Sequence, residues 1–515
     1  MPQGGDQRRR GLTATTQSDG LHWGTPAARW VLAASVLGSG VASLDATVVG
    51  IAVPHIGRSF HVGVSSIQWV ATGYTLTLAG LLLLGGSLGD RYGRKKCFTI
   101  GVAWFAVASA LCGIAPSASA LIAARILQGI GGALLTPGSL AILQASFVAE
   151  DRARAIGAWS GLGGVAAAAG PFVGGELISL ASWRWVFYIN LPVAAAVLWI
   201  SARHVPETRD PSATGRPDLT GAALILVALA ALTYGLIEGP VLGWSSPAIA
   251  VSLALGALSV VAVILVEGHR RHPMLPLGIF RGRQLSAANG VTFVIYGALT
   301  AALFLLPTEL QVGRHYSPTA AGIALLPVTA IMLVLSARSG RLAARIGPRL
   351  QMSVGPVIVG TGLVLLTRAP VVAGYVEGVL PGVVILGLGL AVTVAPLTAT
   401  ALAAAPAEHA GLASAVNNDV ARIAGLIAVA VLPPLAGIAG GAYLNPHLLG
   451  HGFRVAVVVA ACLCAIAGVL AAVTIRNPDD GALPADRRAP IGRQPLSCAV
   501  DAPPAVCATS EAHVP

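Results

Sequence analysis

The sequence predicts an all-α polytopic membrane protein with about 14 transmembrane helices, and three observations lead to this fold class. Of the 515 residues, 55% are hydrophobic and only 10% are charged, with a mean hydropathy of +0.78. A soluble chain carries about 25% charged residues, so this composition cannot cover a surface in contact with water. The apolar runs are about 18–26 residues long, close to the ~20 residues that a helix needs to cross a bilayer. They lack the alternation of a membrane barrel, and backbone groups in lipid must bond within a helix.

The apolar runs place the spans in order along the chain. We expect them at residues 30–54, 67–88, 98–115, 119–143, 155–180, 185–202, 220–238, 247–267, 285–310, 318–337, 350–369, 374–397, 411–438 and 453–475. An even number of spans puts both termini on one side of the membrane. The tails and loops on that side hold 25 Lys and Arg residues, whereas the loops on the other side hold 5. Because positive residues accumulate on the cytoplasmic side, both termini are predicted to be cytoplasmic.

An internal repeat divides the chain into two halves. Residues 86–95 read GSLGDRYGRK and residues 340–349 read GRLAARIGPR, and both fall between the second and third spans of a half. A chance match between two basic, Gly-rich loops is the alternative. The resulting prediction is two six-helix bundles with a helix pair inserted between them. Its segments are a disordered tail (1–28), the first bundle (29–205), a linker with the inserted pair (206–275), the second bundle (276–476) and a disordered tail (477–515).

Several function classes are excluded by what the sequence carries. The net charge of +11 is spread over short loops and does not form a face for nucleic acid. The only lysines are Lys95 and Lys96, and neither is followed by Ser or Thr, so a phosphate-binding G-x-x-x-x-G-K-[ST] loop for ATP is absent from the sequence. The histidines show no metal-ligand spacing, and no nucleophile, base and orienting acid cluster at one depth. We therefore expect no metal, no cofactor and no enzymatic activity.

The loop after the second expected span has a specific pattern. Gly86 and Gly93 permit close backbone approach, and Asp90 is followed by Arg91 and Arg94. A carboxylate at this position can accept hydrogen bonds from a neighbouring helix N-terminus or from an Arg, as a charge-assisted latch. The simpler alternative is a positively charged cytoplasmic loop, which requires neither Asp90 nor fixed glycines.

Two opposite charges lie inside apolar spans. Asp45 is in the first span and Arg125 in the fourth, in the sequence Arg125-Ile-Leu-Gln128-Gly129. At 1.5 Å per residue both lie about 21–22 Å from the cytoplasmic edge, so contact between them is possible. Charged residues at this depth are costly, and each needs a partner. We predict that the pairing of Asp45 with Arg125 switches with a proton, and Gln128 is a further candidate for substrate binding or coupling. The alternative is a static ion pair that holds two helices together.

The fifth expected span contains Gly170-Pro171-Phe-Val-Gly174-Gly175. The proline permits a bend, and the glycines permit close packing against a neighbouring helix. A plain packing face accounts for the glycines nearly as well, but not for Pro171.

The remaining polar residues near the spans are candidates for substrate binding or coupling. Asp419 and Arg422 are spaced to pair on one helix, although intrahelical neutralisation explains them equally well. Glutamates near the outer ends of spans are expected to be half-solvated rim groups that could receive a cationic substrate. The full set is Asn417, Asn418, Asp419, Arg422, Glu238 and Glu309.

Over about residues 30–475 these motifs resemble the major facilitator superfamily, and within it the fourteen-helix drug:proton antiporter family. The departures are Gly50 and Ala166, where that family usually has Asn and Gly. The resemblance implies a monomeric antiporter in the bacterial inner (plasma) membrane that exports drugs or a secondary metabolite in exchange for protons. It also implies that the 86–95 motif stabilises the outward-open state and that the span-5 motif belongs to exporters. The alternatives are an importer or facilitator of the same superfamily, and a membrane scaffold or sensor that does not transport.

Overall fold

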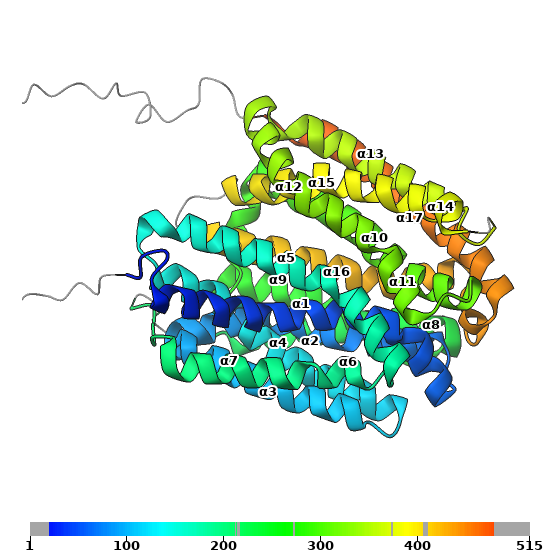
Figure 1. Cartoon of the computed structure of the whole chain (residues 1–515), viewed down its shortest axis with the longest axis horizontal. Coiled ribbons are helices and arrows are strands. Elements are labelled where there is room, and N and C mark those ends of the chain that lie inside the picture. The colour runs from blue at the N-terminus through cyan, green and yellow to red at the C-terminus, as the bar shows by residue number, and fades with distance from the viewer. Residues whose placement is uncertain are drawn as a thin grey trace, which may run out of the picture. The chain divides into compact units, whose positions relative to one another are not determined.

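The computed structural model describes residues 20–211, 213, 217–270, 273–371, 374–404 and 410–477. Within these residues, 14 helical segments are long and apolar enough to cross a membrane, which agrees with the number of spans expected from the sequence (Figure 1). Most of the two predicted tails lies outside the described residues, and so do Cys498 and Cys507.

The helices follow the order of the expected spans. The first group is α1 (Pro26–Phe60), α2 (Val64–Tyr92), α3 (Arg94–Ile114), α4 (Ala118–Ser146), α5 (Ala149–Leu180), α6 (Trp185–Tyr188) and α7 (Asn190–His204). A pair follows, α8 (Leu219–Leu242) and α9 (Pro247–His269). The second group is η1 (Leu277–Arg281), α10 (Arg283–Thr308), η2 (Glu309–Gly313), α11 (Pro318–Ala324), α12 (Leu326–Ile346), α13 (Pro348–Leu366), α14 (Tyr375–Gly378), α15 (Leu380–Ala403), α16 (Ala410–Leu435), η4 (Ala442–Leu444) and α17 (Pro446–Thr474).

The starts of the last span and of the twelfth span differ from the expected positions. The last span was expected from residue 453, but α17 begins at Pro446, where Asn445 accepts the backbone N–H groups of His447 and Leu448 at 3.1 and 3.3 Å. A capping side chain followed by proline fixes a helix start even where the next residues are polar. The twelfth span was expected from residue 374, but the short α14 comes first and α15 begins at Leu380.

Successive spans alternate in direction, which defines two ends. We call the end at which α1 begins and α17 ends the terminal end, and the end at which α1 meets α2 the far end (Figure 1). Within each group, glycines allow the helices to approach closely. A Cβ at Gly85 on α2 would lie 2.1 Å from the Ala133 carbonyl oxygen on α4, so only glycine fits there.

The sequence repeat coincides with a structural one. Gly93 joins α2 to α3 with a φ of 120°, and Gly347 joins α12 to α13 with a φ of 83°. Both angles lie in the left-handed region that favours glycine. Both loops therefore turn at a glycine with a positive φ.

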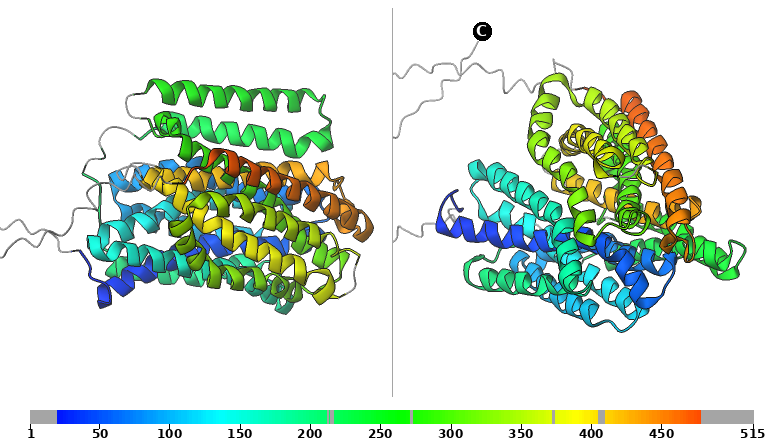
Figure 2. Two further views of the ribbon diagram at one scale, coloured as in Figure 1. Left: turned by 90° about the horizontal axis from the view of Figure 1, so that it is seen from above. Right: turned by 45° about the vertical axis from the view of Figure 1, so that its right-hand side comes forward.

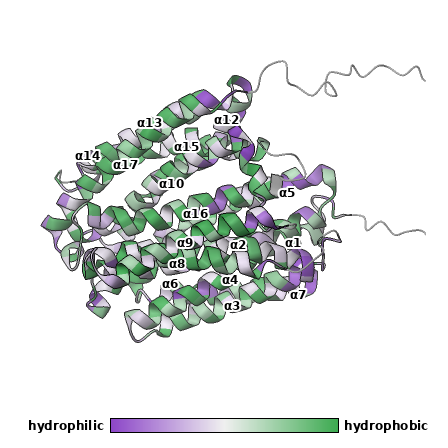
Figure 3. Ribbon diagram, turned by 180° about the vertical axis from the view of Figure 1, so that it is seen from behind, coloured by the Kyte–Doolittle hydropathy of each residue, from purple (hydrophilic) through white to green (hydrophobic). Residues whose placement is uncertain are grey.

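The inserted pair packs on both groups. Helix α8 contacts α9, α2 and α16, and Leu76, Leu229 and Leu426 form a cluster where these elements meet. Helix α9 lies outermost in the view from above (Figure 2) and exposes large apolar side chains, including Val251 at 66% and Leu258 at 67%. A face of this kind would be unstable in water and suits lipid. Hydropathy mapped on the ribbon shows the same apolar character along most helices (Figure 3).

The two helix groups meet at the far end. Gln68 on α2 donates to the carbonyl oxygens of Val429 and Ala430 on α16 at 2.6 and 3.2 Å. Gln311 on η2 donates to the Ile51 carbonyl oxygen on α1 at 3.0 Å. Toward the terminal end α5 and α12 diverge (Figures 1 and 2).

Candidate functional site

A buried network of charged and polar side chains lies at mid-length in the first helix group. Its centre is Asp45 on α1, whose side chain is 0% exposed. Oδ2 of Asp45 accepts a hydrogen bond from Nη1 of Arg125 on α4. Oδ1 accepts from Gln128 Nε2 at 2.9 Å and from Asn190 Nδ2 at 3.0 Å. The carboxyl group therefore faces three donors, an arrangement suited to its ionised form, which only accepts.

Arg125 is enclosed as completely as its partner. It is 1% exposed, and its Nε donates to the Val70 carbonyl oxygen on α2 at 3.1 Å. Nη1 also donates to Gln128 Oε1 at 2.7 Å, and the guanidinium carbon lies 4.6 Å from the ring centre of Tyr74. A buried charge pair of this kind is tolerable only because each charge is neutralised and hydrogen-bonded. The contact between Asp45 and Arg125 that their equal depth made possible is present, and Gln128 hydrogen-bonds both side chains.

Two members of the network were not among the sequence candidates. Ser109 on α3 accepts from Gln128 at 2.8 Å and from Asn190 at 3.3 Å. Asn190 is the first residue of α7, just after the break at Ile189 that separates it from α6. An Asn beside Leu191-Pro192 at a helix start was a usable signal, whereas a single Ser in an apolar helix is ordinary packing.

The loop motif forms a cluster at the terminal end. Asp90 Oδ1 is 2.8 Å from both Nε and Nη2 of Arg94, one helical turn away across the glycine junction. The partner is therefore an Arg of the same motif, one of the two possibilities that the sequence left open. A Cβ at Gly86 would make only ordinary contact with Pro137 on α4, at 3.6 Å. Arg91 follows Asp90 on the last turn of α2.

Glu207 completes this cluster, and sequence reasoning missed it. Its two carboxyl oxygens accept the backbone N–H groups of Lys95 at 3.0 Å and Lys96 at 3.1 Å, in the first turn of α3. A Cβ at Gly93 would lie 2.7 Å from Glu207 Oε1. The carboxylate thus caps the positive end of α3, beside Gly93, whose φ of 120° itself favours glycine.

The glycines of the span-5 motif pack in two directions. Cβ atoms at Gly170 and Gly174 would lie 2.0 Å and 2.9 Å from Thr47 and Val48 side-chain atoms on α1. A Cβ at Gly175 would lie 2.4 Å from the Pro318 carbonyl oxygen on α11. The motif therefore joins α5 to its own group and, at the far end, to the second group.

The polar residues of α16 do not gather at one point. Asn417 donates to Asn289 Oδ1 at 2.9 Å and to Thr292 Oγ1 at 2.8 Å, inside the second helix group. Asn418 is exposed and donates to the Ser414 carbonyl oxygen at 2.9 Å. Asp419 is 7% exposed, and among the described residues no ion pair joins it to Arg422.

The two candidate glutamates have different environments. Glu238 on α8 accepts from Trp69 Nε1 on α2 at 2.9 Å. Glu309 is 0% exposed, so the expectation that it is a half-solvated rim group is wrong. The reason is the π-helical turn Glu309–Gly313, which adds a residue to the turn and directs the side chain inward beside α17.

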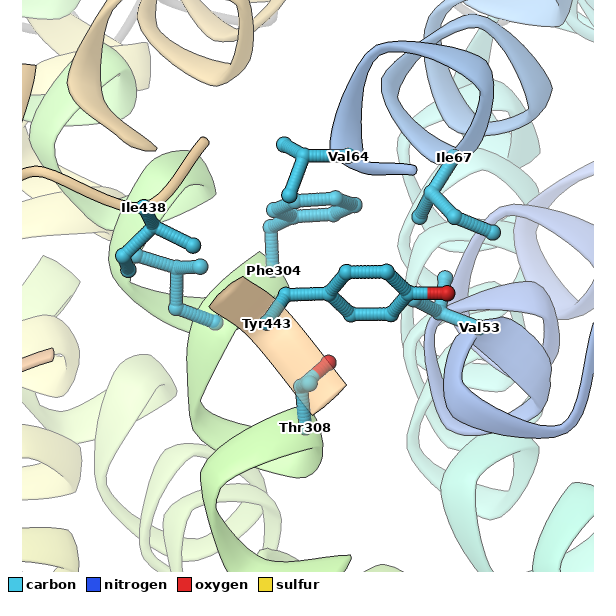
Figure 4. A pocket seen from close by; sticks show the side chains of 8 residues that line it. Val53, Val64, Ile67, Phe304, Thr308, Ile438 and Tyr443 are labelled. Carbon is cyan, nitrogen blue, oxygen red and sulfur yellow. The ribbon is translucent and has the colours of Figure 1, made fainter. Parts of the chain in front are cut away.

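No group of three or more His, Cys, Asp and Glu side chains suited to a metal occurs in the described parts of the chain. A cavity of about 10 Å³ lies at the far end between the helix groups, lined by Val53, Phe304, Thr308, Tyr443 and neighbouring apolar residues (Figure 4). This is about the smallest space that holds one water molecule. The helix groups are therefore closely packed at this point of the far end.

Known proteins share both the sequence and the fold. The model of the Major Facilitator Superfamily matches residues 35–429. Multidrug resistance protein Stp of Mycobacterium tuberculosis (strain CDC 1551 / Oshkosh) is 36% identical over 418 residues, covering 81% of this chain and 77% of that protein. Puromycin resistance protein pur8 of Streptomyces alboniger is 35% identical over 461 residues, covering 85% and 90%.

Solved structures agree on the fold. A bacterial homologue of the human lysosomal transporter Spinster, inward-facing and unoccupied, matches with a TM-score of 0.60 at 17% identity, covering 87% of this chain and 97% of that one. The peptide transporter POT in complex with sulfate matches with a TM-score of 0.65 at 14% identity, covering 88% and 95%. The chain therefore belongs to the Major Facilitator Superfamily and is a multi-pass membrane transporter, not an enzyme.

Proposed function

We propose that this chain is a proton-coupled antiporter that exports small amphipathic molecules, drugs or a secondary metabolite, across the bacterial inner membrane by alternating access. Relatives named for multidrug resistance, puromycin resistance, and tetracenomycin C resistance and export support the direction and the substrate class. The single observation that carries the proton coupling is the buried network in which Asp45 faces Arg125, Gln128 and Asn190.

The network is a proton switch because its two charges depend on each other. While Asp45 is ionised, Arg125 is neutralised and all three donors have an acceptor. A proton on Asp45 removes that negative charge, leaves Arg125 as a buried cation without a counter-charge and turns one acceptor oxygen into a donor. Separation or rearrangement of Asp45 and Arg125 then lowers the free energy. Because α1 and α4 carry the two residues, the rearrangement moves helices of the first group relative to one another.

The closed far end gives this structure a place in the transport cycle. If the terminal end is cytoplasmic, as the distribution of Lys and Arg favours, the two groups meet at the outer end, and α5 and α12 diverge toward the cytoplasm (Figure 1). The cluster of Asp90, Arg94 and Glu207 then lies at the end that must close in the alternate state. We propose that this cluster is the latch of that state, and that the two helix groups are the bundles that move.

The test uses purified protein in liposomes with an imposed pH gradient and puromycin among the probe compounds. The Asp45→Asn variant is expected to lose gradient-driven transport while keeping exchange of compound down its own gradient, because the amide cannot change charge. Gradient-driven transport at the wild-type rate in Asp45→Asn would refute proton coupling at this site. Accumulation in the opposite direction would make the chain an importer. Absence of transport for every compound in the panel would favour the scaffold or sensor.

A further inference from the structure

A second acidic side chain is buried in the other helix group, in an environment opposite to that of Asp45. Glu309 is the first residue of the π-helical turn at the far end of α10 and is 0% exposed. Neither of its carboxyl oxygens has a hydrogen-bond partner among the described residues. An ionised carboxylate without donors in a dry interior is very unfavourable, and such a group takes up a proton instead. The geometry around Asp45 suits a carboxylate, whereas the geometry around Glu309 suits a neutral acid.

Glycines of two elements lie beside the carboxyl group of Glu309. A Cβ at Gly313 would lie 2.3 Å from Oε1, and a Cβ at Gly450 on α17 would lie 3.8 Å from the same oxygen. A side chain at Gly313 would collide with the carboxyl group, and the backbone of α17 lies beside it at Gly450.

The charges near Glu309 do not pair with it in this state. Arg314 follows the same turn, and its guanidinium donates to the Ala369 carbonyl oxygen. Arg454 on α17 acts on Glu309 electrostatically but is itself exposed. Helix α17 also carries His447 and His451, which are exposed, and α11 has no titratable residue. Glu309 can therefore gain a counter-charge only if these elements move or water enters.

Glu309 is connected to the contact that closes the far end. Gln311, two residues later in the same turn, donates to the Ile51 carbonyl oxygen on α1 at 3.0 Å and to the Pro307 carbonyl oxygen at 3.2 Å. Thr308, the preceding residue, lines the small cavity between the groups opposite Val53 (Figure 4). Separation of the groups at this end must displace both neighbours of Glu309 and admit water to the turn.

We infer that Glu309 is a second proton-binding site, which holds its proton while the far end is closed and releases it to the far side when that end opens. This inference rests on the proposed alternating-access function but not on proton coupling at Asp45. It assigns the two acids different tasks, since Asp45 would carry the driving proton and Glu309 would control whether the far end can close. Low pH on the far side favours closure, and high pH favours opening.

The experiment measures the opening of the far end as a function of pH. Spin labels at Leu180 on α5 and Val376 on α14, which are 76% and 67% exposed, report the distance between the two groups by pulsed electron resonance. The measurements use an Asp45→Asn background, so that titration of Asp45 cannot produce the response. Cys462, Cys498 and Cys507 are replaced by Ser so that the label is confined to the two chosen sites.

In that background the ratio of open to closed molecules is expected to rise with pH, by up to about tenfold per pH unit for one proton. Adding Glu309→Gln should keep the closed distance at every pH, because the amide is a permanently neutral isostere. Glu309→Asp should retain a pH response, and Glu377→Gln, at an exposed acid of the same end, should behave as the background does.

Two results would overturn the inference: an unchanged pH response after Glu309→Gln, or a background that shows no response. Monodisperse elution and an unaltered thermal transition of Glu309→Gln establish that the variant is folded. Failure of the proposed proton coupling is detected separately, as gradient-driven transport by Asp45→Asn in liposomes.

Discussion

The hydroxyl of Thr47 on α1 lies 3.1 Å from the Ala167 carbonyl oxygen on α5 and donates to it. This carbonyl is four residues before Pro171, which has no N–H group to complete the helical hydrogen bond. The interhelical bond therefore satisfies the acceptor that the proline leaves open, although the hydroxyl also reaches the Leu44 carbonyl oxygen at 2.9 Å. Thr47 on α1 therefore compensates for the hydrogen bond that Pro171 removes from α5.

Replacing Thr47 by Val should lower the free energy of unfolding by about 1 kcal/mol, because a buried carbonyl loses its donor. The loss should shrink in a Pro171→Ala background, where the restored N–H group bonds Ala167 directly. Thermal unfolding in detergent of the wild type, the two single variants and the double variant measures the coupling between the two positions. Thr47→Ser is the control and should match the wild type; equal losses in both backgrounds would contradict the account.

Gly175→Ala should weaken the closed far end. The added methyl would lie 2.4 Å from the Pro318 carbonyl oxygen, and rigid backbone cannot yield without separating α5 from α11. Overpacking of this kind costs about 1–3 kcal/mol, which is enough to shift a balanced two-state equilibrium strongly toward the open form. Distances between labels at Leu180 and Val376 report the shift.

The matched control is Gly50→Ala on α1, where an added Cβ meets no described atom within 4 Å. It should keep the wild-type distance distribution. An identical distribution for Gly175→Ala would mean that the two helix groups adjust without opening.

Glu207→Ala should destabilise the loop cluster, because the N–H groups of Lys95 and Lys96 lose their acceptors. Loss of a helix-capping acceptor costs about 1 kcal/mol. Glu207→Gln retains one acceptor oxygen without the charge and should lie between the alanine variant and the wild type in melting temperature. A glutamine variant as unstable as the alanine variant would show that the charge, not the hydrogen bonding, matters.

Asp218 should make the inserted helix pair sensitive to acid. Burial would raise the pKa of this carboxyl group, but hydrogen bonds from Gly221 and Glu267 and the charge of Arg270 outweigh burial and hold the pKa below its usual value of 3.8. A lowered pKa means that the ionised form stabilises the fold above that value and that the contribution is lost as the pH falls below it. The ion pair between Asp218 and Arg270 joins the start of α8 to the end of α9.

The difference in melting temperature between wild type and Asp218→Asn should therefore be constant near neutral pH and shrink as the pH falls below 3.8. Asp218→Ala also removes the N-cap acceptor of Gly221 and should keep a residual deficit of about 1 kcal/mol at acid pH. A difference that grows on acidification would contradict the lowered pKa.

The parts of the molecule that local sequence determines were predictable. Span number follows from the length of apolar runs. The equal depth of Asp45 and Arg125 made their contact possible, because a charge in lipid needs a partner. Asn190, Ser109 and Glu207 were not found, since their roles depend on partners 81, 19 and 112 residues away. Glu309 was misjudged because its burial depends on the turn type and on Gly450, neither of which apolar content reveals.

Helix α5 is packed at one end and open at the other. An added Cβ at Gly170, Gly174 or Gly175 would collide with a neighbouring helix, whereas one at Gly157 or Gly161 would meet no described atom of another element within 4 Å. Glycine weakens a helix, so a glycine face without close neighbours does not stabilise the conformation seen here. If both ends serve the cycle, α5 exchanges one set of neighbours for another, and large side chains at positions 157 and 161 would leave this state unchanged while preventing the opposite one from forming.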